Sequence, residues 1–311
     1  MAGDGGKDAA AARGGGRPAM GERRAADAPW PAGAPSPEEF AARVWDEGRA
    51  RYRDLPWRGV DDPYAVLVSE IMLQQTQVAR VERFWKRFLT AFPTIDALAS
   101  GATSDVLELW QGLGYNRRAL ALKRAADQCS AERGGRLPAT AEELEALPGI
   151  GPATAAGVMA FAYQRPATYL ETNVRSVFLH ELFPGREGVT DRELRPLVEA
   201  TCDAGDPRGW YYALLDYGAY LKAAHPNPSR RSAHHARQSA FEGSRRQKRA
   251  WVVRRVLAEP EGVAADEVLA GLAAAERAAG RDVPDRALFD SIVADLAGEG
   301  FFTWENGRLR A

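Results

Sequence analysis

The sequence has few of the features that mark exported, membrane or metal-binding proteins. Its 311 residues contain no apolar run of membrane-spanning length, and the N-terminus lacks the apolar core of a signal peptide. The two cysteines, Cys129 and Cys202, are far apart and have no metal-ligand spacing, so we expect reduced thiols in a cytosolic protein. Because the formal net charge is only −1, any contact with a polyanion must depend on local basic patches.

Strand patterns are absent from most of the chain. Residues 1–35 are rich in Gly, Ala, Arg and Pro without periodicity, which predicts a disordered segment. Order is expected to start at Ser36-Pro-Glu-Glu39, which combines an N-cap, a first-turn proline and a capping-box glutamate. From there to about residue 222 every periodic segment indicates a helix, so we predict an all-α domain over residues 36–222. Examples are Val78–Phe88, Asp105–Trp110, Asn116–Glu132, Ala153–Tyr163 and Arg192–Cys202.

One carboxylate lies inside an apolar helical stretch, Leu67-Val-Ser-Glu70-Ile-Met-Leu-Gln-Gln-Thr-Gln77. Asp62-Pro63 supplies an N-cap and a first-turn proline for this helix. Glu70 lies beside the face predicted to be buried, in the C-terminal half, where burial and the helix dipole both raise a carboxyl pKa. Such a glutamic acid can donate a proton near neutral pH. The alternative is a glutamate at the rim of a core helix with its carboxylate in water.

A second motif, Leu147-Pro-Gly-Ile-Gly-Pro-Ala-Thr-Ala155, places two glycines between helical segments. Thr140 and Glu143 match a capping box for the first segment. A tight turn at Gly149 and Gly151 leaves backbone N–H groups exposed at the start of the next helix, which suits a phosphate group. The alternative is an ordinary turn between two helices.

Together with four further strings, these motifs resemble the helix-hairpin-helix DNA glycosylases, and most closely the MutY-type adenine DNA glycosylases. The strings are Leu55-Pro-Trp-Arg58, Leu109-Trp-Gln-Gly-Leu-Gly-Tyr115, Leu170-Glu-Thr-Asn-Val174 and Leu215-Asp-Tyr-Gly-Ala219. The resemblance implies an all-α fold of two helical subdomains. It also implies a base-excision repair enzyme that hydrolyses the N-glycosidic bond of a flipped-out base, namely adenine opposite guanine or oxidised guanine. Its partner would be double-stranded DNA with a mismatch or lesion, and we expect a cytoplasmic, nucleoid-associated monomer without a membrane contact.

The resemblance also implies two catalytic carboxylates. Glu70 would protonate the leaving purine, and Glu171 would stabilise the sugar cation or form a transient adduct. Glu171 stands where the family has an aspartate, and Thr172 stands where it has a glycine. The alternative is that Glu171 only caps a surface helix and that Asp216 supplies the second carboxylate. The remaining residues predicted to contact the base or the DNA are Gln74, Gln75, Tyr115, Gly149, Gly151, Thr154 and Asn173.

The family pattern breaks after residue 221. MutY-type enzymes carry four cysteines here, spaced C-x6-C-x2-C-x5-C, that bind an iron–sulfur cluster. The matching positions hold Lys222, Ser229, Ser232 and Gln238. Because iron–sulfur clusters need thiolates, we predict no cluster, no other cofactor and no metal. A few histidines in this stretch, without cysteine, are weak evidence for zinc.

Residues 223–249 are predicted to form a basic loop without a cluster. We interpret Arg230 and Arg231 in this loop as DNA-contacting residues, the alternative being a solvated linker. Ala153 stands where related bifunctional glycosylases carry a lysine nucleophile. Since alanine cannot form a Schiff base, a monofunctional enzyme is expected.

Residues 250–311 are predicted to form a separate winged-helix-like unit. Helices are expected at Val252–Leu257, Asp266–Ala279 and Arg286–Leu296, followed by a hairpin around Asn306-Gly307. This tail does not resemble the Nudix-related domain with which many MutY-type enzymes recognise oxidised guanine, so the opposite-base preference stays open. The unit could contact DNA or only pack against the rest of the chain. Two rival functions are a glycosylase for a different base and a non-catalytic DNA-structure binder, although binding alone requires neither carboxylate.

Overall fold

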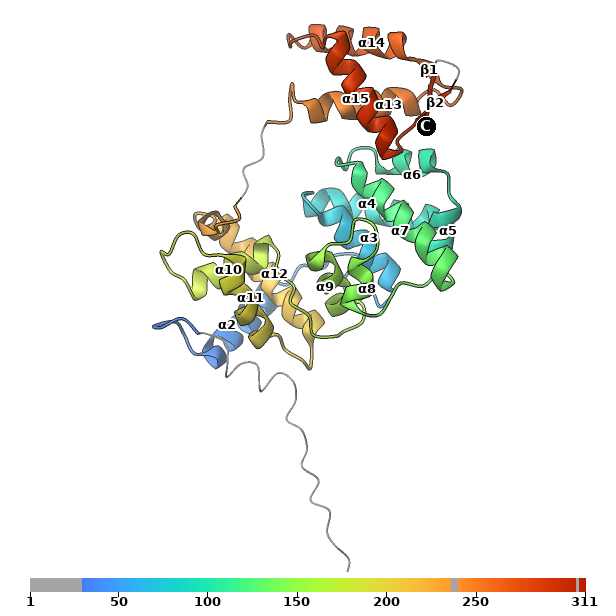
Figure 1. Cartoon of the computed structure of the whole chain (residues 1–311). Coiled ribbons are helices and arrows are strands. Elements are labelled where there is room, and N and C mark those ends of the chain that lie inside the picture. Colours follow the sequence, from blue (N-terminus) through green and yellow to red (C-terminus); the bar gives the residue numbers. More distant parts are fainter. Residues whose placement is uncertain (1–29, 236–239, 306–307) are drawn as a thin grey trace, which may run out of the picture.

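The computed structural model describes residues 30–235, 240–305 and 308–311, and most of these residues lie in helices (Figure 1). The predictions made for residues 1–29, for Gln238 and for the Asn306-Gly307 turn lie outside the described residues. Among the residues described, no helix is long and apolar enough to cross a membrane.

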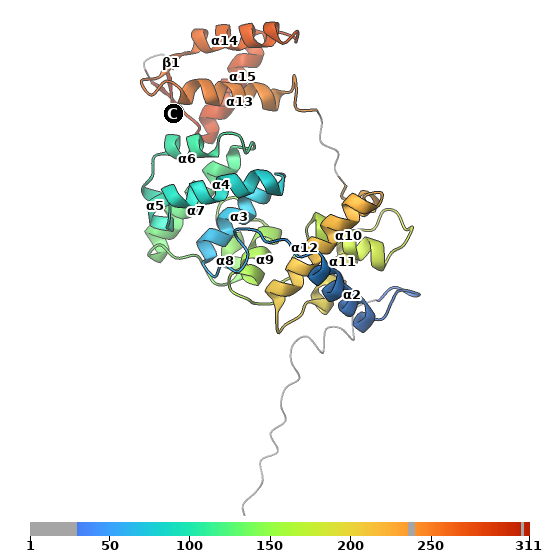
Figure 2. The same cartoon turned by 180° about the vertical axis from the view of Figure 1, so that it is seen from behind.

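Two helical subdomains lie side by side, as both views of the molecule show (Figures 1 and 2). The first subdomain is continuous in sequence and consists of α3 (Pro63–Leu73), α4 (Val78–Ala91), α5 (Ile95–Ser100), α6 (Thr103–Trp110), α7 (Arg117–Arg133), α8 (Ala141–Glu145) and α9 (Pro152–Phe161). The second joins α2 (Pro37–Ala50) to α10 (Thr172–Glu181), α11 (Asp191–Thr201), α12 (Pro207–Ala224) and the 3-10 turn η1 (Pro228–Arg231). Helix α9 contacts α3 within its own subdomain and α12 across the boundary.

Three predicted helix caps are confirmed. The Ser36 side chain accepts a hydrogen bond from Glu39 N, and the Glu39 carboxylate accepts one from Ser36 N, which completes the capping box of α2. Asp62 caps α3 by accepting from Tyr64 N. Thr140 caps α8 through Glu143 N. In the described part of residues 36–222 the only bridge of strand type is the isolated pair Val189 and Ser232, so the all-α prediction holds.

The cores of the two subdomains are aromatic-rich and continuous with each other. Tyr64 of α3 donates its hydroxyl to Phe92 O, and Trp85 of α4 donates its indole N–H to Ala65 O, so both buried polar groups are satisfied. In the second subdomain Phe40 packs 5.0 Å from Phe178, measured between ring centroids. This packing holds α2, although it is distant in sequence, against α10.

The C-terminal unit, residues 245–311, has the helix and strand order of a winged helix. It contains α13 (Arg245–Leu257), β1 (Val263–Ala264), α14 (Ala265–Ala278), α15 (Arg286–Glu299), β2 (Thr303–Glu305) and β3 (Arg308–Arg310). The strands form an antiparallel sheet in the order β1-β3-β2. The hairpin of β2 and β3 agrees with the prediction, whereas β1 was not predicted.

The start of this unit corrects the predicted boundary at residue 250. Helix α13 begins at Arg245, not at Val252, because Ser244 caps it by accepting from Gln247 N. The basic run at its start lacks apolar periodicity but is paired with acids of the neighbouring helices. Lys248 is buried against Glu276 at 3.1 Å, and Arg249 lies 2.6 Å from Glu299. Residues 245–249 therefore belong to a helix and not to a basic loop.

Candidate active site

Glu70 lies on α3 and faces α9. A Cβ atom at Gly157 of α9 would stand 2.4 Å from Glu70 Oε2, so the helix can approach this carboxyl only because residue 157 is glycine. Burial and the negative charge of Glu171 outweigh a hydrogen bond from Tyr169 and raise the pKa of Glu70 to about 8. The residue as a whole is half-buried, whereas its carboxyl group is buried. The raised pKa keeps this carboxyl protonated at neutral pH, which is the state that a proton donor requires.

Glu171 caps the N-terminus of α10 and faces the same site. Its Oε1 atom accepts hydrogen bonds from Asn173 N at 2.6 Å and from Val174 N at 3.1 Å. Burial raises the pKa of Glu171, and the positive charge of Lys222, these two N–H groups and the Asn173 side chain oppose that rise. The alternative interpretation is thus right that Glu171 is a helix cap, but its carboxylate is also close enough to raise the pKa of Glu70.

The two carboxyl groups have different environments, which separates their protonation. Glu70 receives one hydrogen bond, from a tyrosine, whereas Glu171 receives backbone and amide donors and lies near a cation. Glu171 is therefore expected to lose its proton at a lower pH than Glu70. Two carboxyl groups of which one stays neutral and the other ionises have the protonation states of an acid and a cation-stabilising base.

Helix α12 supplies the remaining wall of the site. A Cβ atom at Gly218 would stand 2.2 Å from Asn173 O, so α12 touches the first turn of α10 directly. Lys222 lies one helical turn further on the same face, and side chains on a helix lean toward its N-terminus, which brings the Lys222 stem toward α10. Asn173 Oδ1 is buried and has no hydrogen-bond partner among the described residues. A buried acceptor without a partner is rare, and this one is available to a water or a substrate hydroxyl.

Asp216, the alternative second carboxylate, is engaged by two arginines. Arg58 donates to both of its oxygens at 2.7 Å, and Arg53 Nε donates to Oδ1 at 2.5 Å. The Asp216 side chain is fully buried and that of Arg58 is 2% exposed. This buried carboxylate, with both oxygens held by arginines, joins the chain before α3 to α12. Removing the Arg58 side chain would leave an uncompensated buried charge.

Gln74 and Thr154 connect the loop after α3 to the helix after the Gly-x-Gly turn. Gln74 Nε2 donates to Thr154 Oγ1 at 2.9 Å, and Thr154 is buried. Gly149 has φ +75°, and a Cβ atom there would stand 2.5 Å from Ala121 Cβ, so this position requires glycine. Gly151 is the exposed N-cap of α9. The turn between α8 and α9 therefore presents its backbone to solvent, as a phosphate site requires.

Gln75 and Tyr115, two of the residues predicted to contact the base or the DNA, lie on loops that share one anchor. Both have left-handed backbones, with φ of +57° and +50°, which costs about 1 kcal/mol or more for residues other than glycine. Arg118 Nη1 donates to Ile71 O at 2.8 Å, and Arg118 Nη2 donates to Gly114 O at 3.0 Å. One buried arginine thus ties the end of α3 to the loop that carries Tyr115.

Arg230 and Arg231 differ in their surroundings. Arg231 Nη1 donates to Phe183 O at 2.5 Å and Nη2 donates to Leu179 O at 2.7 Å, so its guanidinium caps the end of α10. Arg230 is exposed. Of the two predicted DNA contacts, only Arg230 presents its side chain to solvent.

The positions that carry cluster cysteines in the family do not fit an iron–sulfur cluster. Lys222 faces Glu171, Ser229 Oγ donates to Asn227 Oδ1 at 2.8 Å, and the Ser232 hydroxyl accepts from His234 N at 3.1 Å. None of these groups is a thiolate, and Gln238 lies outside the described residues. Within the described ranges no three His, Cys, Asp or Glu side chains converge to hold a metal ion. The absence of a cluster stays a prediction.

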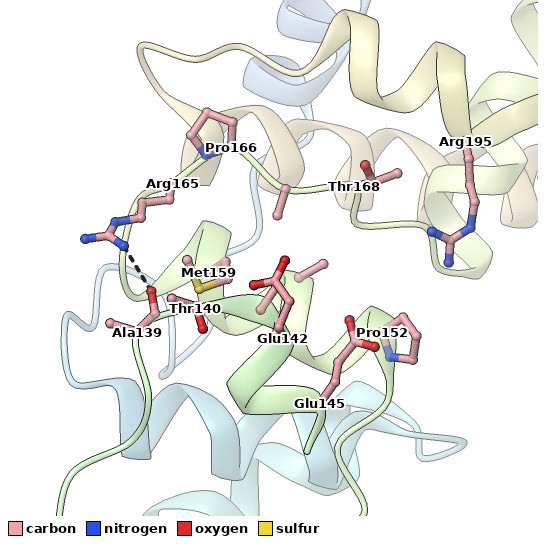
Figure 3. A pocket seen from close by; sticks show the side chains of 13 residues that line it. Ala139, Thr140, Glu142, Glu145, Pro152, Met159, Arg165, Pro166, Thr168 and Arg195 are labelled. Carbon is pink, nitrogen blue, oxygen red and sulfur yellow. Dashed lines mark hydrogen bonds between the residues drawn. The ribbon is translucent and has the colours of Figure 1, made fainter. Parts of the chain in front are cut away.

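An open pocket lies on another face of the hairpin (Figure 3). It is lined by Glu142 and Glu145 of α8, by Arg165 before α10 and by Arg195 of α11. Arg165 Nη1 donates to Ala139 O at 2.9 Å, which closes one side of the pocket. Its lining includes none of the predicted site residues, so this pocket is separate from the site at Glu70 and Glu171.

Comparison with known proteins identifies the family. Residues 68–200 match the HhH-GPD superfamily of base excision DNA repair proteins. This range contains Glu70, the hairpin at Gly149 and Gly151, and Glu171. The chain contains an HhH-GPD domain. The site thus lies at the boundary between the two helical subdomains of an HhH-GPD fold.

Relatives of this HhH-GPD protein include glycosylases of two kinds. An adenine DNA glycosylase of Mycobacterium tuberculosis is 44% identical over 128 residues, which is 40% of this chain and 42% of the relative. A thymine-DNA glycosylase of Aeropyrum pernix is 35% identical over 159 residues, which is 51% of this chain and 66% of the relative. A solved thermostable thymine-DNA glycosylase superposes with a TM-score of 0.53 and 26% identity over 59% of this chain and 86% of that one. The chain spans less than half the length of the mycobacterial relatives.

Several residues of the HhH-GPD site did not follow from sequence reasoning. Tyr169 is two positions before Glu171, and Gly157 is one helical turn after Ala153, so each lies just outside a motif already quoted. Lys222 was noted only as a missing cysteine, and Arg118 only as part of a helix. The one local signal for these residues was Gly157, because a glycine inside a buried helix marks the close approach of another group.

Proposed function

We propose that this protein is a monofunctional DNA glycosylase that hydrolyses the N-glycosidic bond of a base flipped out of duplex DNA. The substrate we favour is adenine opposite guanine or oxidised guanine. One observation carries the proposal, namely that Glu70, whose pKa is raised by burial and by Glu171, lies close to a Glu171 that Lys222 supports. The adenine-specific relatives support the choice of adenine.

The two carboxyl groups supply the steps that base excision needs. Glu70 gives its proton to a ring nitrogen of the base while the N-glycosidic bond breaks and its electron pair moves to the base. The sugar is left as an oxocarbenium-like cation, which the Glu171 carboxylate stabilises or captures as a transient adduct. Water then adds to the sugar carbon, and its proton returns to the Glu70 carboxylate. Asn173 Oδ1 offers an acceptor for that water or for a sugar hydroxyl.

The surrounding loops fit the handling of duplex DNA. Gln75 and Tyr115 are exposed at the ends of two anchored loops and would enter the duplex where the base leaves it. The turn at Gly149 and Gly151 would bind a backbone phosphate through its N–H groups. The proposed partner is double-stranded DNA with a mismatch or lesion, bound by one copy of the chain, and the protein would work at the nucleoid.

A second target base is favoured by a specific observation. The thymine-DNA glycosylase of Aeropyrum pernix is matched over a larger share of its length than the mycobacterial adenine-specific relatives are. Thymine opposite guanine is therefore the second candidate substrate. A non-catalytic binder is disfavoured, because a buried carboxyl whose pKa is about 8 destabilises the fold at neutral pH and contributes nothing to binding.

The test is single-turnover excision on a panel of duplexes that carry A·G, adenine opposite oxidised guanine, T·G and U·G pairs. Alkali after the reaction reveals abasic sites as strand breaks. We expect adenine to be released fastest from the first two duplexes, and Glu70→Gln to release no base at a comparable rate. Faster release of thymine from the T·G duplex would make thymine, and not adenine, the substrate. Absence of release from every duplex by the parental protein would overturn it.

A further inference from the structure

The C-terminal unit is docked beside the loop that carries Tyr115, as Figures 1 and 2 show by its position over α6. Glu299, at the end of α15, accepts from Arg117 Nε at 2.7 Å and from Arg249 Nη2 at 2.6 Å. Arg117 starts α7 and follows Tyr115 by two positions. Although partial burial alone would raise the pKa of Glu299, hydrogen bonds and charge from the two arginines lower it. This ion pair therefore joins the C-terminal unit to the first subdomain.

Tyr115 itself is held by two arginines from two different units. Arg246 of α13 donates from Nη1 to the Tyr115 hydroxyl at 3.1 Å. The guanidinium carbon of Arg118 lies 5.4 Å from the centroid of the Tyr115 ring. The side chain is 39% exposed and its backbone is left-handed. An exposed aromatic residue in a strained conformation persists only when its surroundings hold it there.

The charges of α15 disfavour a direct reading of DNA by this unit. The third helix of a winged helix is the one expected to enter a groove. Here that helix carries Asp290, Asp295 and Glu299, and each of these acids is in an ion pair with at least one arginine. These charges are therefore engaged within the protein. The end of α15 is instead used to attach the unit to the first subdomain.

We propose that the C-terminal unit positions Tyr115, the residue that would enter the duplex. Arg246 holds the tyrosine in the geometry that opens duplex DNA. Arg246 is a positioning residue that acts through the tyrosine hydroxyl. The inference rests on the proposed function in one respect, namely that Tyr115 enters the duplex. Holding the ring before DNA arrives means that less conformational freedom is lost on insertion, which favours the opened state.

The test measures base flipping separately from base excision. A duplex carries 2-aminopurine next to the mismatched adenine, and its fluorescence rises when the neighbouring base leaves the stack. For Arg246→Ala we expect the fluorescence rise and the single-turnover excision rate to fall by roughly tenfold, the size expected when one hydrogen bond to a charged group is lost. Arg246→Lys, which keeps the charge, should recover part of both signals. Arg254→Ala, an exposed arginine on the same helix, is the matched control and should change neither signal.

A double-mutant cycle tests whether Arg246 acts through the hydroxyl. Tyr115→Phe removes only that group, so adding Arg246→Ala to it should cause little further loss of flipping. A full additional loss in the double variant would overturn the proposal, as would an Arg246→Ala variant that flips like Arg254→Ala. If the parental protein flips a base but releases none, the proposed function fails while this cycle still decides the role of Arg246.

Discussion

Replacing Glu70 by glutamine tests the origin of the proton that base excision requires. The side chain keeps its shape and its hydrogen bonding, but the amide has no carboxyl proton to donate. With a pKa of about 8, roughly nine-tenths of Glu70 is protonated at pH 7, whereas a carboxyl at the ordinary value of 4.5 is protonated in about 0.3% of molecules. The site therefore increases the acid form roughly 300-fold at neutral pH.

The assay is single-turnover excision between pH 6 and pH 9.5. The parental rate should stay level up to about pH 8 and then fall about tenfold per pH unit as Glu70 loses its proton. The Glu70→Gln variant should be slower by roughly a hundred- to ten-thousand-fold, the range that general acid catalysis contributes, and should lack the alkaline decrease. A Gln variant with near-parental turnover, or a parental rate that is unchanged at pH 9.5, would refute the assignment.

The same substitution has an opposite effect on stability, which gives a second readout. The folded-state pKa of Glu70 lies above the unfolded-state value, so its contribution is complete below about pH 4.5 and is lost as the pH rises to about 8. The shift corresponds to about 5 kcal/mol. The Tm advantage of Glu70→Gln over the parental protein should therefore grow between pH 5 and pH 8 and then level off. A constant difference across that range would contradict the burial of an ionisable Glu70.

Four further predictions follow from the site and its flanks. Lys222→Met should raise the pKa of Glu171 further and move the acidic limb of the pH–rate profile of excision to higher pH, whereas Lys222→Arg should keep the parental profile. Identical profiles for all three proteins would contradict the interaction of Lys222 with Glu171. Glu171→Asp should keep the helix cap but draw the carboxylate back by one methylene. A displacement of about 1 Å can lower the excision rate on the order of a hundredfold, so a rate near the parental one would exclude Glu171 from catalysis. Borohydride should trap no protein–DNA adduct, because Ala153 offers no amine; an adduct that disappears in Lys222→Met would instead reveal a lysine nucleophile. Arg230→Ala should reduce the slope of log affinity for DNA against log salt concentration by roughly one unit, whereas Arg231→Ala should lower Tm without changing that slope. The reverse pattern would refute the assignment of Arg230 to DNA and of Arg231 to the end of α10.

The sequence was sufficient for most of the helices and for the acid of the proposed reaction. Helix starts depend on residues a few positions apart, so the caps at Ser36, Asp62 and Thr140 could be predicted from adjacent letters. The buried face of α3 follows from apolar spacing, and Glu70 is the one carboxylate within that stretch. The roles predicted for Glu171 and the hairpin glycines came from the resemblance to a family, because no local pattern singles these residues out.

Only the tertiary structure decided what the basic residues after Leu221 do. Charged side chains at helix ends have no local periodicity that reveals their partners. Lys222 lies near Glu171, Arg231 caps α10, and the basic start of α13 is helical because acids of α14 and α15 bind it. Arg246 reaches Tyr115 across 131 positions of sequence. Capping and periodicity are local and can be read from the chain, whereas the surroundings of a charge depend on which distant segments pack against it.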